Sequence, residues 1–262
     1  MTVLAWDQPG EKKYQAGVDR GVLYLPTKAA VVWNGLLGVE ETFNRESKPY
    51  YLEGQKYLQY QVGGEFEGKL RAFTYPDEFE EMDGVYTKNG GLFIHDQQPK
   101  NFSLSYRTKL GNDLEGLELG YRIHMLYNLQ AITDSRSYST EGGQSAPMAF
   151  SWTITSTPIV QGWGYKATAH LSLKSTDLTP DTLAYLEGIL YGTPGTAARL
   201  PTLGELIARV EKPPTIIDNG DGTWTASSPD SDVTLVDATT FQVTGADVIY
   251  LNEDTYQITT TG

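Results

Sequence analysis

The chain has 262 residues, a formal net charge of −13 and no cysteine. The charge argues against tight DNA binding, because proteins that neutralise DNA phosphates are normally basic. The absence of cysteine excludes disulfides, thiol catalysis and cysteine-ligated zinc. We expect no signal peptide and no membrane span, since the sequence lacks a basic leader and a run of about 18 apolar residues.

The N-terminal quarter of the chain predicts strands separated by turns. Residues 22–25 and 31–33 are apolar runs of the kind found in buried strands. A hairpin is predicted over residues 50–62, with Glu53 and Gly54 in its turn.

The next segment, residues 66–75, alternates between apolar and polar side chains and predicts a half-buried strand that ends at Pro76. An acidic loop follows, which we interpret as solvated or interfacial rather than catalytic. Its acids are Asp77, Glu78, Glu80, Glu81 and Asp83.

A long hairpin is predicted over residues 102–127. Apolar residues occupy even positions in the first strand and odd positions in the second, so each strand is expected to have one buried and one wet face. This pattern places Tyr106, Tyr121 and Ile123 in the core. It places Arg107 and Arg122 on the wet or interfacial side.

Two further strands and two helices complete the first 212 residues. Alternation predicts strands at residues 148–154 and 165–173. Thr179, followed by Pro180, predicts a helix start, and Gly192 predicts its end. The capping-box pair Thr202 and Glu205 opens a second short helix. We expect both helices to pack on the sheet.

The remaining residues, 213–262, form a distinct segment that begins at a Pro-Pro pair. The segment has eight acidic residues and no lysine or arginine, so it carries −8 of the net charge. A short motif repeats three times, with Trp224, Phe241 and Tyr256 at equivalent positions. We therefore predict a small all-β module of three hairpins with an aromatic core, separate from a domain of residues 1–212.

No motif in the chain predicts catalysis. Residues 218–222 resemble part of a calcium loop, but the ligand spacing is wrong and a hairpin turn is the better interpretation. His95, His124 and His170 are far apart in sequence. His124 and His170 alternate with core positions, which favours surface or interface roles over metal binding. We expect no enzyme activity, no cofactor, and no catalytic or metal-binding residue.

Several short motifs occur in order along residues 1–201: WDQPG (6–10), GVDRGVLY (17–24), YY (50–51) with Gly54 and KYL (56–58), AFTYPDEF (72–79), LSYR (104–107) with GND (111–113), GYRIH (120–124), FSW (150–152) and LEGILYG (186–192). Together they resemble the major tail proteins, or tail tube proteins, of long-tailed bacteriophages, particularly those of actinobacteria. The segment after residue 213 lies outside this resemblance.

The resemblance implies a mainly β fold: a tail-tube-type β-sandwich with one or two short helices, in which residues 50–62 are the candidate to cover apolar surface on a neighbouring subunit. The small all-β C-terminal module is expected on the tube exterior, because six copies with a charge of −8 each would repel one another in a lumen. Such proteins assemble in the host cytoplasm into hexameric rings, which stack into the tail tube of the virion. DNA leaves through the tube without specific binding. The implied partners are further copies of the chain, the tape measure protein, and tail terminator or distal tail proteins, with no membrane partner.

Two alternatives remain open from the residues. One is a carbohydrate-binding β-sandwich, because exposed aromatic rings stack on sugars, and the other is another tail ring component such as a distal tail protein. For the tube interpretation, eight residues are candidates for ring or stacking contacts: Tyr50, Tyr51, Lys56, Tyr57, Asp77, Glu78, Arg107 and Arg122.

Overall fold

The computed structural model describes residues 5–43, 46–62, 66–88, 91–136, 138, 140, 148–159 and 166–210, and six strands between residues 215 and 259. The chain forms two compact units, Met1–Pro201 and Thr202–Gly262. The second unit therefore begins before the helix that the sequence pattern assigned to the first domain. The fold is mainly β, with a large antiparallel sheet and two short helices.

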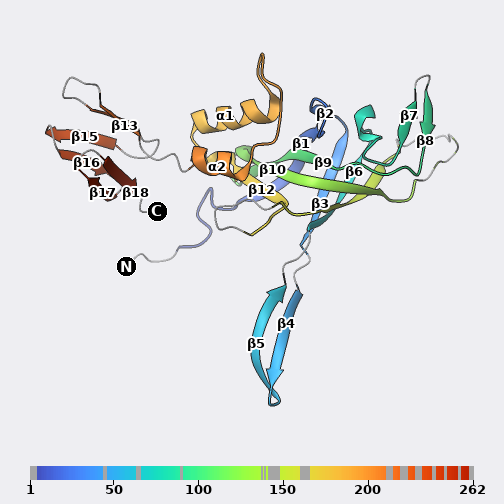
Figure 1. Cartoon of the computed structure of the whole chain (residues 1–262), viewed down its shortest axis with the longest axis horizontal. Coiled ribbons are helices and arrows are strands. Elements are labelled where there is room, and N and C mark those ends of the chain that lie inside the picture. Colours follow the sequence, from blue (N-terminus) through green and yellow to red (C-terminus); the bar gives the residue numbers. More distant parts are fainter. Residues whose placement is uncertain are drawn as a thin grey trace. The chain divides into compact units, whose positions relative to one another are not determined.

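The first unit is built on an eight-stranded antiparallel sheet (Figure 1). Its strands are β1 (Tyr14–Tyr24), β2 (Val31–Trp33), β3 (Leu36–Phe43), β6 (Phe66–Ala72), β9 (Phe102–Asn112), β10 (Gly116–Thr133), β11 (Phe150–Ser156) and β12 (His170–Lys174). Seven follow the order β2-β1-β9-β10-β11-β6-β3, and β12 pairs with β10. Two further hairpins pair only within themselves among the described strands: β4 (Glu46–Leu52) with β5 (Gln55–Val62), and β7 (Tyr86–Lys88) with β8 (Leu92–Ile94).

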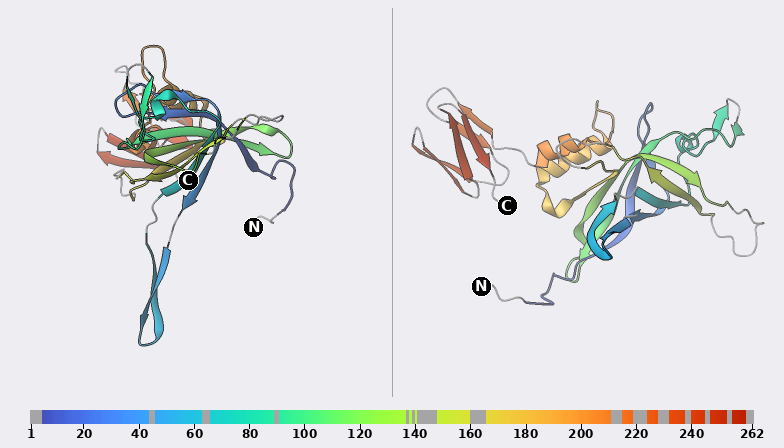
Figure 2. Two further views of the ribbon diagram at one scale, coloured as in Figure 1. Left: turned by 90° about the vertical axis from the view of Figure 1, so that its right-hand side faces the viewer. Right: turned by 60° about the horizontal axis from the view of Figure 1, so that its bottom comes forward.

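One hydrophobic core contains side chains from strands near both ends of this strand order. Leu23 of β1 and Leu70 of β6 belong to the same buried cluster, so the sheet curls around its own apolar face (Figure 2). The alternation predicted for residues 66–75 and 148–154 is confirmed within β6 and β11, since Leu70, Trp152 and Ile154 are fully buried, whereas Met148 is exposed and precedes β11. Tyrosine, tryptophan and phenylalanine rings fill the centre of this core.

The β9–β10 hairpin corrects the predicted face assignment. Cross-strand pairing joins Ile123 to Arg107 and His124 to Tyr106, and directly paired residues lie on the same face. Tyr106 and Ile123 are both buried, as predicted, but they lie on opposite faces of the hairpin, so the expectation of one buried and one wet face was wrong. The simple alternation also fails farther along β10, because the register shifts between Leu126 and Leu129.

The helix α1 (Pro180–Tyr191) lies along the other face of the sheet and begins and ends where the sequence predicts. The Thr179 hydroxyl accepts a hydrogen bond from the Thr182 backbone N–H (3.3 Å), and Gly192 follows the helix at φ +81°. The Tyr24 hydroxyl donates to the Leu190 carbonyl (2.7 Å), which ties β1 to the last turn. This face is thus covered here by a helix rather than by water.

The acidic loop is anchored in the core, contrary to the expectation of a solvated loop. It opens with a 3₁₀ turn, η1 (Asp77–Phe79), and Phe79 and Met82 are buried in the main core. The Asp83 carboxylate is almost fully buried and pairs with Arg136. Glu81 pairs with two lysines, which hold the pKa of its carboxyl below the usual value. The loop therefore helps to close the core.

The second unit contains α2 (Leu203–Val210) and six strands. The predicted capping box is confirmed: the Thr202 N–H donates to Glu205 Oε2 (2.8 Å), and the Glu205 N–H donates to Thr202 Oγ1 (3.2 Å). The predicted three hairpins are also confirmed. They are β13 (Thr215–Asp218) with β14 (Trp224–Ser227), β15 (Asp232–Asp237) with β16 (Thr240–Thr244), and β17 (Asp247–Asn252) with β18 (Thr255–Thr259). The predicted aromatic core depends on the side chains of Trp224, Phe241 and Tyr256, which lie outside the described set. Residues 219–223 of the possible calcium loop also lie outside the described residues.

Candidate functional site

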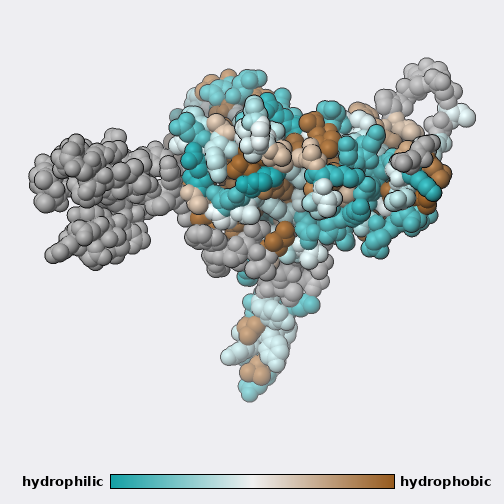
Figure 3. Space-filling view, turned by 45° about the horizontal axis from the view of Figure 1, so that its top comes forward, coloured by the Kyte–Doolittle hydropathy of each residue, from teal (hydrophilic) through white to brown (hydrophobic). Residues whose placement is uncertain are grey.

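The β4–β5 hairpin presents the largest set of exposed aromatic side chains that the sequence singled out. Glu53 and Gly54 form its turn with φ angles of +50° and +78°, as a two-residue hairpin turn requires. The exposed fraction is 61% for Tyr51 and 68% for Tyr57. The hairpin extends beyond the eight-stranded sheet (Figures 1 and 2), and apolar residues are visible on it in Figure 3.

An isolated two-stranded hairpin is at best marginally stable in water. The β4–β5 hairpin nevertheless exposes four further large apolar side chains on its strands: Tyr50, Leu52, Leu58 and Tyr60. Exposed apolar surface of this kind is typical of a protein interaction site. The arrangement therefore fits a hairpin that is covered by another molecule.

The structure brings only half of the eight predicted contact residues together. Tyr50, Tyr51, Lys56 and Tyr57 all lie on the β4–β5 hairpin. Asp77 and Glu78 lie in η1, and Arg107 and Arg122 lie in the central strands of the sheet.

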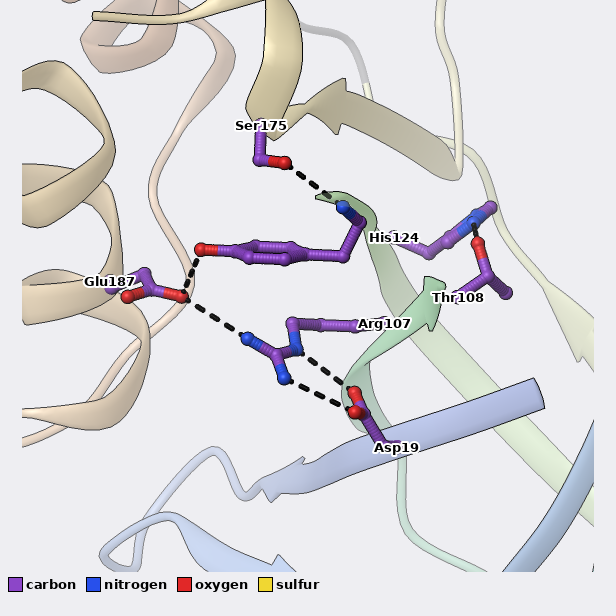
Figure 4. A network of polar contacts seen from close by, with 7 residues as sticks. Asp19, Arg107, Thr108, His124, Ser175 and Glu187 are labelled. Atoms are coloured by element: carbon purple, nitrogen blue, oxygen red, sulfur yellow. Dashed lines mark hydrogen bonds and ion pairs between the residues drawn. The ribbon is translucent and has the colours of Figure 1, made fainter. Parts of the chain in front are cut away.

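The Arg107 side chain makes its contacts within the same chain (Figure 4). Its Nε and Nη2 donate to the two carboxylate oxygens of Asp19 at 2.9 and 3.2 Å, and Nη1 lies 3.5 Å from Glu187 Oε1. The guanidinium lies 4.1 Å from the ring centroid of Tyr121. Burial lowers the pKa of Arg107, but the hydrogen bonds and charge of Asp19 outweigh it and raise that pKa overall. Its side chain is only 11% exposed, so the expectation of a wet position was wrong.

A second polar cluster, which sequence reasoning missed, joins Glu41, His124 and His170. His124 Nδ1 lies 3.4 Å from Glu41 Oε1 and 3.2 Å from His170 Nε2, and His170 Nδ1 lies 3.5 Å from Glu41 Oε2. Tyr106 stacks on His124, with ring centroids 4.7 Å apart. The two histidines meet because β12 pairs with β10, a contact that their sequence spacing does not reveal.

Burial, hydrogen bonds and neighbouring charges shift the pKa values of Glu41 and His170 in this cluster. Burial lowers the pKa of His170, and the charges of His124 and Arg122 lower it further against the opposing effect of Glu41. Burial acts to raise the pKa of Glu41, but hydrogen bonds from His124 and Tyr106 lower it overall. These directions favour a neutral imidazole at His170 beside an ionised carboxylate at Glu41.

The comparisons with known proteins identify structural neighbours only. The sequence matches no known family profile and no curated protein. One similar solved structure is titled as the sheath-tube complex of an extracellular contractile injection system, at 14% identity and a TM-score of 0.31, covering 59% of this chain and 88% of that one.

Two other neighbours come from assemblies of the same kind. One is the sheath/tube terminator of that injection system, with 14% identity, a TM-score of 0.30 and coverage of 61% of this chain and 97% of the neighbour. The other is the baseplate of the anti-feeding prophage, with 9% identity, a TM-score of 0.32 and coverage of 68% of this chain and 100% of the neighbour.

None of the helices in the described part of the chain has the length and apolar character that a membrane span requires.

Proposed function

We propose that the chain is a structural, non-catalytic component of a phage-type tail that polymerises as stacked hexameric rings into the tube for DNA ejection. The observation that carries the proposal is the exposed aromatic hairpin β4–β5, which needs a covering surface. The hexameric ring and the tube are proposed because the motifs along residues 1–201 resemble, in their order, those of tail tube proteins. The same resemblance supplies the partners: a tape measure protein and tail terminator or distal tail proteins.

The strand order supports a closed ring. Among the described strands, β2, β3 and β12 each pair with one neighbour only, so each subunit has more than one strand edge. Edge strands carry unpaired backbone groups that pair readily with another chain. Two different edges on one subunit permit head-to-tail contacts, and such contacts generate a ring when the rotation closes. The β4–β5 hairpin, which follows β3 directly, would then reach the neighbouring ring.

The first test removes the apolar surface of the hairpin. Tyr51→Ser combined with Tyr57→Ser should abolish assembly, because both exposed rings would lose their contact with the neighbouring ring. The monomer should keep its stability within about 0.5 kcal/mol, since exposed substitutions seldom have larger effects. Negative-stain microscopy and light scattering measure assembly, and thermal unfolding measures stability.

The matched control for this test is Tyr185→Ser, which removes a 45% exposed ring from α1 and should leave assembly intact. Tubes formed by the double variant at the wild-type concentration would contradict the role of the hairpin. Wild-type protein that remains monomeric and binds glycans would instead favour the carbohydrate-binding alternative.

The second test concerns the acidic module, residues 213–262, for which we infer a place on the tube exterior. Its charge of −8 per copy would produce strong repulsion if six copies were crowded in a lumen, whereas salt screens exposed charges beyond about 8–10 Å. Truncation after Lys212 should give tubes with a smaller outer diameter and an unchanged bore. Electron microscopy of full-length and truncated tubes measures both, and a wider bore in the truncated tubes would place the module inside.

A further inference from the structure

Three potential metal ligands converge inside the first unit from strands that are far apart in the sheet order. Glu41 lies on β3, His124 on β10 and His170 on β12. One ligand atom from each of the three lies within 4.8 Å of the other two. We propose that these residues bind a divalent transition-metal ion, with Zn²⁺ as the best fit, independently of tube assembly.

The two separations measured from His124 Nδ1 are close to those of tetrahedral coordination. Zinc binds imidazole nitrogen and carboxylate oxygen at about 2.0–2.2 Å, so neighbouring ligand atoms around a tetrahedral ion lie about 3.3 Å apart. His124 Nδ1 lies 3.2 Å from His170 Nε2 and 3.4 Å from Glu41 Oε1, whereas the 3.5 Å contact between His170 and Glu41 uses their other atoms, Nδ1 and Oε2. One ligand atom from each residue lies within 4.8 Å of the other two, so the side chains must draw together around an ion.

The ligands are oriented by further hydrogen bonds of the kind that metal sites use. His124 Nε2 lies 3.1 Å from the Thr108 hydroxyl, which leaves Nδ1 to face Glu41 and His170. The Tyr106 hydroxyl donates to Glu41 Oε1. Ligating histidines and carboxylates usually carry such outer partners, which fix the tautomer and the orientation of the ligand.

The ligand types in the cluster determine which ion it prefers, and the exposure of the side chains determines whether the ion can enter. Two imidazoles and one carboxylate favour zinc, cobalt or nickel over calcium and magnesium, which prefer oxygen ligands. The three side chains are 10–17% exposed, so an ion and a water molecule in the fourth position have access from solvent. Arg122 is the nearby positive charge that opposes binding, since its charge acts on His170.

A bound ion would link strands that do not pair with one another. β3 pairs only with β6 among the described strands, whereas β10 and β12 pair together on the other side of β11 and β6 in the strand order. Coordination by Glu41 would therefore join the end strand of the curled sheet to its centre. Ligands that bind only the folded state raise its stability, so Zn²⁺ should raise the unfolding temperature.

The test uses the full-length chain without an affinity tag, after removal of metal. Titration calorimetry with Zn²⁺ should show one ion per chain. His124→Gln and His170→Gln should weaken binding by more than about 100-fold, and Thr108→Val by about 10–100-fold, as expected for a group that orients a ligand. His95→Gln is the matched control, because this exposed histidine lies outside the cluster and should not change the affinity.

A second measurement does not depend on the folding of the variants. Co²⁺ bound to the wild-type chain should show the intense visible bands of a four-coordinate ion, and X-ray absorption should count two imidazole ligands. Absence of stoichiometric binding by the wild-type chain would show that the cluster is only a hydrogen-bonded network. Equal loss of affinity in His95→Gln would likewise overturn the proposal.

Discussion

Replacing Trp152 by alanine should lower the free energy of unfolding of the first unit by about 3–5 kcal/mol, the usual cost of removing a large buried aromatic side chain. The Trp152 ring is fully buried and packs edge-on against Phe79 and Tyr75, with centroids 5.1 and 5.4 Å away. Its Nε1–H also donates to Asp83 Oδ1 (3.0 Å). The substitution therefore creates a cavity and removes one donor from a buried carboxylate.

Two variants separate these effects in denaturant unfolding. Trp152→Phe keeps most of the ring packing but loses the donor to Asp83, so it should cost about 1–3 kcal/mol. Trp6→Ala removes a tryptophan that is 76% exposed and should change stability by less than about 0.5 kcal/mol. A Trp152→Ala protein as stable as the Trp6→Ala control would show that the core does not depend on this ring.

The features that the sequence predicts correctly depend on residues close together in the chain. The Thr179 cap, the Thr202–Glu205 capping box and the Glu53–Gly54 turn are decided by hydrogen bonds or φ angles within a few residues. Strand alternation at residues 66–72 is likewise visible locally, because each side chain faces either the core or solvent.

The errors and omissions arise where distant segments meet. The register shift after Leu126 reverses which positions of β10 face the core, and periodicity alone does not locate such a bulge. The cluster of Glu41, His124 and His170 depends on the pairing of β10 with β12 and on the curl that brings β3 near them. Arg107 was misplaced for the same reason, since its partners lie on β1 and α1.

Substitution of Arg107 is the second change from which we expect a large loss of stability. Its guanidinium bridges Asp19 of β1 and Glu187 of α1 while it lies against Tyr121 of β10. Glu187 Oε1 also accepts a hydrogen bond from the Tyr121 hydroxyl (2.8 Å), so the network joins the helix to the sheet. Removal of the guanidinium would leave two partly buried carboxylates without their cation.

Arg107→Ala should therefore destabilise the first unit by about 2–3 kcal/mol. The loss is smaller than the 3–5 kcal/mol typical of a fully buried pair, because the two carboxylates are 27–32% exposed and solvent partly screens them. Denaturant unfolding measures the loss, and a double-mutant cycle with Asp19→Asn isolates the pair. Arg71→Ala is the matched control: Arg71 is an exposed arginine on β6, and its loss should cost less than about 0.5 kcal/mol. If Arg107→Ala matched that control and impaired only assembly, Arg107 would act between subunits instead.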